Sequence, residues 1–256
     1  MKIHFLGTCS GTEPMTNMNH CSLVFEINGV YYWFDAGENC SHTASTKMGI
    51  DLSRVRSIFI SHPHIDHIGG LANLLYSLNK LVWRNIPHTD NGGVINIFLP
   101  DKDILSHVIA IAFSGRKTFP ITMKDYTVSD GVIYEDENIK VTAQHTTHLR
   151  EDGSNGWHAY SFLIEAEGKR VLFSGDVGNP CELDCQIGDG VDILIMETGH
   201  HKVSDVLDYT ETKNIKKLIF NHHGREIIGD RAAAEALIKS RGLNAVISKD
   251  EQVEEI

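Results

Sequence analysis

The sequence predicts an α/β fold in one domain, and three observations support this. Pairs of β-prone runs joined by tight-turn residues fill most of the first half of the chain, and strand and helix patterns alternate in the second half. The 256 residues contain no composition break and no flexible linker. Residues 1–256 are therefore expected to form a single domain.

The first half is expected to contain mostly strands, beginning with residues 1–7. Asn28-Gly29 separates two β-prone runs and is a strong hairpin signal, because both residues tolerate positive φ. Leu71–Trp83 has apolar residues spaced as on one face of a helix. The other elements predicted here are strands over Leu23–Ile27, Val30–Phe34, Val55–Ile60 and Ile95–Leu99, a helix over Asp101–Phe113, and a hairpin of Val132–Tyr134 with Ile139–Ala143.

The second half is expected to alternate strands and helices. Val191–Met196 is almost continuously apolar, which is typical of a strand buried on both faces. Gly242 is a natural end for a helix over Arg231–Ser240. The charged tail Lys249–Ile256 is expected to fray. The remaining predictions are a strand pair of Tyr160–Ala166 and Arg170–Phe173, a helix over Val203–Glu211, and strands over Leu218–Phe220 and Val246–Ser248.

Charge and cysteine content limit the function classes. The formal net charge is −11, which disfavours extended binding to a nucleic-acid polyanion. No apolar run is long enough for a membrane span, and the first residues turn polar too soon for a signal peptide. Five cysteines, an odd number, favour reduced thiols in the cytoplasm. Cys181 and Cys185 are interpreted as buried or idle thiols, with a metal site as the weaker alternative.

The stretch Ser61–His67 is the strongest functional signal. It places three histidines and an aspartate within six residues, directly after the predicted strand Val55–Ile60. Imidazole nitrogens and carboxylate oxygens are ligands that suit zinc and its neighbours. Potential ligands also follow three other apolar runs, and this repeated pattern supplies enough side chains for two ions that each keep a position for water. The residues after those runs are His145 and His148, Asp176, and His222 and His223.

Taken together, these motifs resemble the metallo-β-lactamase superfamily over nearly the whole chain. The resemblance includes H-x-H-x-D-H at residues 62–67, the aspartate of Phe34-Asp35-Ala36-Gly37, and Ser174-Gly175-Asp176. It implies an α/β fold, specifically a four-layer αβ/βα sandwich. By motif, it also implies one ion bound by His62, His64 and His148, a second bound by Asp66, His67 and His222, and Asp176 bridging the two. The ions are expected to be Zn²⁺, with Mn²⁺ or Fe as alternatives.

Several of these assignments have competitors. His145 competes with His148, which is preferred because it stands where the loop begins. His223 competes with His222, which is preferred because the family pattern puts the ligand two residues after the apolar run. Asp35 is expected to fix the histidine loop by accepting hydrogen bonds. Its alternative is an ordinary turn aspartate at the end of a strand.

Within the superfamily, the chain looks most like the ribonuclease Z and phosphodiesterase branch. The first-strand turn Phe5–Gly11 and the run Met196–His200 carry this likeness. It implies that Glu197 orients His200, which would give a proton to the leaving group. His201 is the competing choice, and both Glu197 and His200 have the alternative of being polar loop residues. Arg225 is a candidate for contact with a phosphate oxygen or, equally, an ion-paired surface residue.

The expected function is that of a dinuclear metal-dependent hydrolase of phosphodiesterase type. Metal-bound hydroxide would attack phosphorus, with Asp66 orienting it. A long basic Gly/Pro-rich insertion, like the arm that grips tRNA in ribonuclease Z, is not found in the sequence, so a small phosphate ester is the expected substrate. Two alternatives stay open: hydrolysis of a carbon-centred ester, lactone, thioester or β-lactam bond, and a non-catalytic metal-binding scaffold. A homodimer is compatible with the resemblance.

Overall fold

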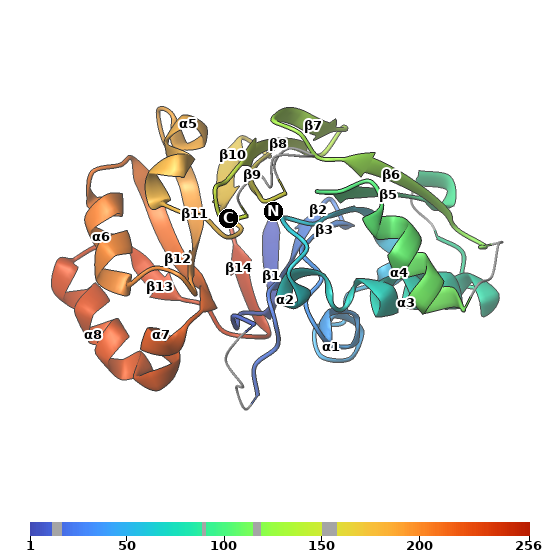
Figure 1. Cartoon of the computed structure of the whole chain (residues 1–256), viewed down its shortest axis with the longest axis horizontal. Coiled ribbons are helices and arrows are strands. Elements are labelled where there is room, and N and C mark those ends of the chain that lie inside the picture. The colour runs from blue at the N-terminus through green and yellow to red at the C-terminus, as the bar shows by residue number, and fades with distance from the viewer. Residues whose placement is uncertain (12–16, 89–90, 115–118, 150–157) are drawn as a thin grey trace. The chain divides into compact units, whose positions relative to one another are not determined.

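The computed structural model describes the chain except residues 12–16, 89–90, 115–118 and 150–157 (Figure 1). It divides into two compact units. Unit 1 comprises Met1–Gly7, Asn19–Val128 and Asp250–Ile256, and unit 2 comprises Thr8–Met18 and Ser129–Lys249. The single domain expected from the sequence stays a prediction.

Unit 1 is built on a seven-stranded mixed sheet in the order β14-β1-β2-β3-β4-β5-β6. The first three pairings are antiparallel and the last three are parallel. At the β2–β3 hairpin, Asn28 and Gly29 both adopt positive φ, as the Asn-Gly signal predicts. The strands are β1 Lys2–Gly7, β2 Ser22–Ile27, β3 Val30–Phe34, β4 Val55–Phe59, β5 Val94–Leu99, β6 Thr122–Thr127 and β14 Gln252–Glu255.

Helices cover one face of the unit 1 sheet (Figure 1). Leu71, Leu74, Leu75 and Leu78 line the buried side of α3 and pack in one apolar core with residues of β3, β4 and β5. The spacing of these leucines predicts this stripe. The helices are α1 Cys40–Thr46, α2 Ile65–Ile68, α3 Leu71–Trp83 and α4 Ile104–Phe113, with short 3-10 turns η1 Leu52–Arg54 and η2 Asn91–Gly93.

Unit 2 repeats the same sheet pattern in the order β13-β12-β11-β10-β9-β8-β7, with three parallel and then three antiparallel pairings. Val191–Met196 lies within β11, in the middle of the parallel part, and all but Asp192 of it is buried. The strands are β7 Gly131–Glu135, β8 Lys140–His145, β9 Tyr160–Ala166, β10 Lys169–Phe173, β11 Val191–Thr198, β12 Ile215–His223 and β13 Ala245–Ile247.

The helices of unit 2 also pack on its sheet. An apolar core joins α6 and α8 to β10, β11 and β12. Gly242 ends α8 in the left-handed conformation, as predicted. The helices are η3 Pro180–Leu183, α5 Asp184–Ile187, α6 Val203–Glu211, α7 Arg225–Gly229 and α8 Arg231–Arg241. Because the carboxyl ends of parallel strands meet at one edge, β10, β11 and β12 bring Asp176, Glu197 and His222 together.

The structure corrects two sequence predictions. The expectation of a frayed tail over Lys249–Ile256 is wrong, because Gln252–Glu255 forms β14 and pairs antiparallel with β1. The strand predicted over Leu218–Phe220 is too short, since β12 continues through His223. Strand β6 has no counterpart in the prediction, because its exposed polar side chains lack an apolar alternation. No helix in the described part of the chain has the length and apolar character needed to cross a membrane.

Candidate active site

In unit 1, Asp35 organises the histidine loop. It follows β3, adopts a positive φ of 55° and is completely buried. One carboxylate oxygen accepts a hydrogen bond from the Ser61 backbone N–H at 2.6 Å, and the other accepts from the Ser61 hydroxyl at 2.8 Å. The second oxygen also lies 2.7 Å from Nδ1 of His67. One aspartate therefore ties together both ends of the loop from Ser61 to His67.

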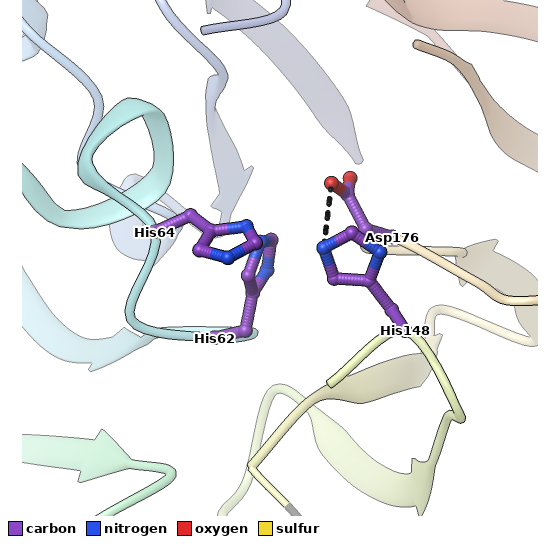
Figure 2. Close-up of side chains that lie close together, drawn as sticks. All are labelled: His62, His64, His148 and Asp176. Atoms are coloured by element: carbon purple, nitrogen blue, oxygen red, sulfur yellow. Dashed lines mark hydrogen bonds and ion pairs between the residues drawn. The ribbon is translucent and has the colours of Figure 1, made fainter. Parts of the chain in front are cut away.

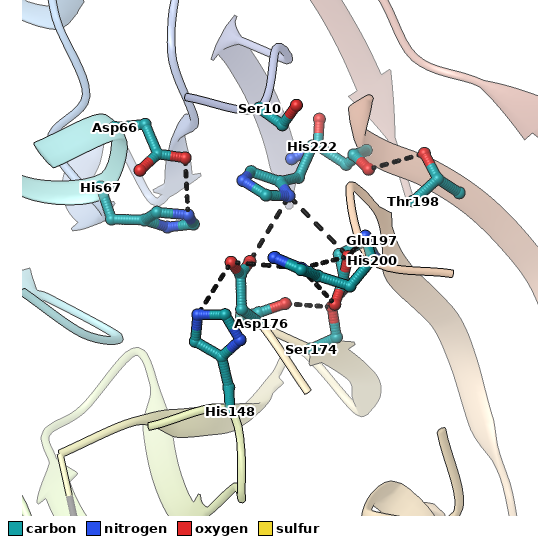
Figure 3. A network of polar contacts seen from close by, with 12 residues as sticks. Ser10, Asp66, His67, His148, Ser174, Asp176, Glu197, Thr198, His200 and His222 are labelled. Carbon is teal, nitrogen blue, oxygen red and sulfur yellow. Dashed lines mark hydrogen bonds and ion pairs between the residues drawn. The ribbon is translucent and has the colours of Figure 1, made fainter. Parts of the chain in front are cut away.

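Side chains of the histidine loop face one another in two pairs, His62 with His64 and His67 with Asp66. Nε2 of His62 lies 3.0 Å from Nδ1 of His64, and the two rings meet nearly at right angles (Figure 2). Nε2 of His67 lies 3.4 Å from Oδ2 of Asp66 (Figure 3). Since Nδ1 of His67 faces Asp35, its Nε2 is the atom available to a metal ion.

Close backbone packing holds the end of this loop against β3. The Ala36 N–H donates to the His67 carbonyl at 2.6 Å, and the Gly70 N–H donates to the Ala36 carbonyl at 2.8 Å. A Cβ atom on Gly70 would lie 2.2 Å from the Gly37 carbonyl oxygen. Only glycine permits this approach at position 70.

In unit 2, Asp176 presents a different oxygen to each of two histidines (Figure 3). Oδ2 lies 3.6 Å from Nε2 of His148, and Oδ1 lies 3.5 Å from Nδ1 of His222. These distances exceed the 2.7–3.2 Å typical of an N–H···O hydrogen bond. Two ligand atoms on one tetrahedral ion, each 2.0–2.2 Å from it, lie about 3.4 Å apart. The donor set around Asp176 therefore has the spacing of metal ligands, and Nδ1 of His200 also lies 3.6 Å from Oδ2.

Two threonines hold the His148 segment in place. The Thr146 hydroxyl donates to the Asp176 carbonyl at 2.7 Å. Glu182 accepts from the Thr147 backbone N–H at 2.9 Å and also from the Thr147 hydroxyl. A Cβ atom on Gly178 would lie 2.2 Å from the Thr147 hydroxyl oxygen, so glycine is needed there. Sequence reasoning missed Thr146, Thr147 and Glu182, because threonine and glutamate in a loop carry no distinctive pattern.

The competing histidines have different surroundings. His145 lies 2.7 Å from Asp130, whereas His148 faces Asp176. His223 is buried with Nε2 3.0 Å from the Ser248 carbonyl, and burial lowers its pKa to about 4. His222 adopts a positive φ of 48°, which turns its ring toward Asp176.

Glu197 and His200 form a buried acid beside a half-buried base. Glu197 is 1% exposed and accepts from the His200 backbone N–H at 2.9 Å, while Nδ1 of His200 lies 3.1 Å away. Burial acts to raise the pKa of Glu197, but His200 and His222 outweigh it and lower that pKa. The hydrogen bond to Glu197 raises the pKa of His200 above its usual value. The competing His201 directs Nε2 to the Val177 carbonyl at 3.0 Å, and the same atom lies 3.5 Å from Oε1 of Glu197.

Ligand-type atoms of Asp176, Glu197, His200 and His222 all lie within 4.8 Å of one another. This group can hold a cation and can also move a proton, because it combines carboxylates with imidazoles. Arg225 begins α7 and lines a pocket of about 350 Å³ whose wall also includes His200. Arg225 is exposed and shares this pocket wall with His200, and its contact with a phosphate oxygen stays a prediction.

Residues 1–191 match the family described as Anti-Pycsar protein Apyc1. The chain belongs to this family. The match includes the histidine loop, His148 and Asp176 and ends before Glu197.

Other comparisons relate this Apyc1-family chain to ribonuclease Z. It is 25% identical over 276 residues to ribonuclease Z of Methanothermobacter thermautotrophicus, covering 87% of this chain and 86% of that protein. The fold is similar to human tRNase Z, short form, with a TM-score of 0.74 at 17% identity, covering 100% of this chain and 99% of that one. It is also similar to the metallo-β-lactamase fold protein YhfI of Bacillus subtilis, with a TM-score of 0.77 at 16% identity and the same coverage.

These relationships confirm the predicted superfamily and fold class. The chain is an α/β metallo-β-lactamase superfamily protein near ribonuclease Z, with two mixed sheets flanked by helices. They also confirm the predicted enzyme class, a metal-dependent hydrolase of phosphodiesterase type, and do not favour hydrolysis of carbon-centred bonds or a non-catalytic scaffold. The described residues include His and Asp side chains arranged as candidate metal-binding clusters.

Proposed function

We propose that this Apyc1-family chain hydrolyses a small phosphate diester, such as a cyclic nucleotide or a dinucleotide, with two divalent ions. The observation that carries the proposal is the arrangement of Asp176, whose two oxygens face His148 and His222 at 3.6 and 3.5 Å. A carboxylate that faces a histidine with each of its oxygens could contribute to the binding of both ions. The kinship with ribonuclease Z supports a phosphodiester as the bond that is broken.

The proposed ligand set follows the motifs of the sequence. One ion would be held by His62, His64 and His148, the second by Asp66, His67 and His222, and Asp176 would bridge them. Zn²⁺ is the proposed metal, with Mn²⁺ or Fe as alternatives, because imidazole and carboxylate suit all three. When bound, such ions make a water molecule acidic and stabilise negative charge on phosphate oxygens.

The chain's own residues would complete the reaction. Asp66 would orient the attacking water, whose oxygen bonds to phosphorus as the bond from phosphorus to the leaving alcohol breaks. Because Nδ1 of His200 faces Glu197 at 3.1 Å, Nε2 is the atom that would protonate the departing alkoxide. His200 would then recover a proton from the water that was consumed. A dinucleotide or other linear diester would give one phosphate monoester and one alcohol, whereas a cyclic nucleotide would open to a single phosphate monoester that carries the freed hydroxyl.

Size and charge support a small substrate over an extended nucleic acid. The net charge of −11 opposes a long polyanion except where local cations outweigh it. None of the five cysteines forms a disulfide, which supports a reducing, cytoplasmic compartment: Cys9, Cys21 and Cys40 are buried, and Cys181 and Cys185, expected to be buried or idle, are exposed. We also propose that the chain acts as one domain over residues 1–256 and that it forms a homodimer.

A substrate screen of the metal-loaded protein tests the proposal. Bis(4-nitrophenyl) phosphate, cyclic nucleotides, a dinucleotide, phosphate monoesters, lactones and thioesters are compared at equal concentration. The proposal expects the highest kcat/KM among the diesters, with a matched Asp66→Ala variant losing most of it. Strong lactone or thioester cleavage beside near-zero diester cleavage would overturn the proposal.

A further inference from the structure

The pocket of about 350 Å³ in unit 2 opens beside His200. On the proposed chemistry, His200 delivers its proton to the leaving alkoxide, so the leaving alcohol must lie against this histidine. The pocket wall continues from His200 to Lys202, Arg225 and Ser10. The space next to the proposed acid is therefore a candidate subsite for the leaving group, and it is large enough for a small organic group.

The floor of the pocket is closely packed backbone. A Cβ atom on Gly199 would lie 2.6 Å from the His222 ring, and one on Gly224 would lie 2.6 Å from the Thr198 carbonyl oxygen. The Ser10 N–H donates to the His223 carbonyl at 3.1 Å, which joins the segment bearing Ser10 to the end of β12. The shape of the floor is thus fixed by hydrogen bonds and by glycines that nothing larger can replace.

Ser10 supplies an unused hydroxyl to this pocket. Its side chain is 5% exposed, and the hydroxyl has no hydrogen-bond partner among the residues that the structure describes. Ser10 lines the pocket wall, and its hydroxyl can meet solvent or a ligand there. Because Ser10 lines the pocket, a ligand there would receive a hydrogen bond from it.

The charged side chains of the pocket favour an anion. Lys202 and Arg225 bring two cations to its wall in a chain whose net charge is −11. Glu226, the carboxylate on this wall, accepts a hydrogen bond from the Val203 N–H at 2.9 Å and so caps the start of α6. Lys202 forms no ion pair with any residue in the described ranges, and its ammonium group can therefore serve a ligand.

We propose that this pocket binds the leaving alcohol and selects one that carries an anionic group. The inference rests on the proposed function, because it assigns the alcohol to the side of His200. Lys202 and Arg225 provide the charge selectivity, and Ser10 donates a hydrogen bond to the same group. A substrate whose leaving alcohol bears a second phosphate or a carboxylate would be preferred over its neutral analogue.

Two matched diesters test this selectivity. Methyl 4-nitrophenyl phosphate and methyl 3-carboxy-4-nitrophenyl phosphate differ only in a carboxylate on the leaving phenol. The wild type is expected to show a higher kcat/KM for the carboxylated diester. Lys202→Ala should lower this preference about two- to fivefold, the size of an exposed ion pair, and Lys202→Glu should lower it further. Lys239→Ala, an exposed lysine on α8, is the matched control and should keep the wild-type preference.

Binding of the free phenols separates the two proposals. Carboxylated nitrophenol should bind the protein more tightly than 4-nitrophenol, and Lys202→Glu should abolish the difference. Hydrolysis of both diesters at equal kcat/KM, with no effect of Lys202→Glu, would overturn the inference and leave the proposed function intact. No hydrolysis of either diester, with tighter binding of the carboxylated phenol, would overturn the proposed function while the anion pocket stands.

Discussion

Oδ2 of Asp35 lies 2.7 Å from Nδ1 of His67, and both side chains are completely buried. The same carboxylate also accepts two hydrogen bonds from Ser61, at the other end of the histidine loop. A carboxylate behind a metal-binding imidazole fixes the ring and its tautomer. We therefore propose that Asp35 sets the position of His67 and is not a metal ligand itself.

Asp35→Asn should weaken metal binding. An amide keeps the size of the side chain, but it is neutral and has only one oxygen to accept the hydrogen bonds now shared by two. The expected loss is about ten- to hundredfold in metal affinity, measured by competition with a chromogenic chelator. Asp103→Asn at the exposed start of α4 is the control and should bind metal as the wild type does. Unchanged affinity in Asp35→Asn would show that Asp35 is only a turn residue.

Alanine variants of His148 and His145 should differ in metal content, because only His148 is proposed to bind an ion. His148 faces Asp176 at 3.6 Å, whereas His145 lies 2.7 Å from Asp130. His148→Ala is expected to lose one ion per chain, measured by elemental analysis, together with most of the activity. His145→Ala should keep the full metal content. The opposite pattern would transfer the ligand role to His145.

The fold was predictable from sequence where its signals are local. The Leu71–Trp83 helix matches α3 because four leucines share one face, and the Asn28-Gly29 hairpin follows from backbone freedom at two residues. Strands β6 and β14 were not predicted. The side chains of β6 are mostly exposed, and β14 is a charged strand whose stability comes from pairing with β1 across the sequence. Pairing over such a distance leaves no periodic pattern in the chain.

The candidate site was predictable to the level of residue types that bind metals. Histidine and aspartate after apolar runs indicate ligands on their own. The residues that hold these ligands in place carry no such signal in the sequence. Ser61 and Glu182 gain their role only from the partners that the fold provides. Ser10 is likewise an ordinary serine in sequence and becomes distinctive only because the fold places it in the wall of the pocket beside His200.

Gly178→Ala should displace the His148 segment. Its Cβ atom would lie 2.2 Å from the Thr147 hydroxyl oxygen, which Glu182 holds. The expected result is a metal affinity about tenfold lower, the lower end of the effect of disturbing a ligand's support. Gly229→Ala is the matched control, because its Cβ would meet no atom within 4 Å. Equal affinities for the two variants would contradict the role assigned to the Thr147–Glu182 contact.

The rate on substrates with poor leaving groups should fall as pH rises through the pKa of His200. The hydrogen bond to Glu197 raises this pKa, so the imidazolium form persists to higher pH than in an ordinary histidine. His200→Gln should slow turnover about 10²- to 10⁴-fold for poor leaving groups and far less for nitrophenol. The fall in rate with rising pH should also disappear in this variant. Metal content should stay at the wild-type level, and a loss of metal would identify His200 as a ligand.

The metal-free protein should lose stability as pH falls from about 6.5 toward 4. Burial lowers the pKa of His223 to about 4, so in this window the unfolded chain binds a proton that the folded chain does not. The free energy of unfolding should fall by about 3 kcal/mol from this residue, measured by urea titration at pH 7 and at pH 4. His223→Gln should show a smaller change between the two pH values, and an equal change would refute the assignment.

The most direct test of the central claim is a titration of the metal-free protein with Zn²⁺, followed by hydrolysis of bis(4-nitrophenyl) phosphate. The proposed two-ion centre predicts that diesterase activity rises until about two ions are bound per chain and then levels off. The Asp66→Ala variant should bind one ion and lose most activity. Full activity with one ion per chain, or strong lactone or thioester cleavage with almost no diester cleavage at two ions, would contradict the account.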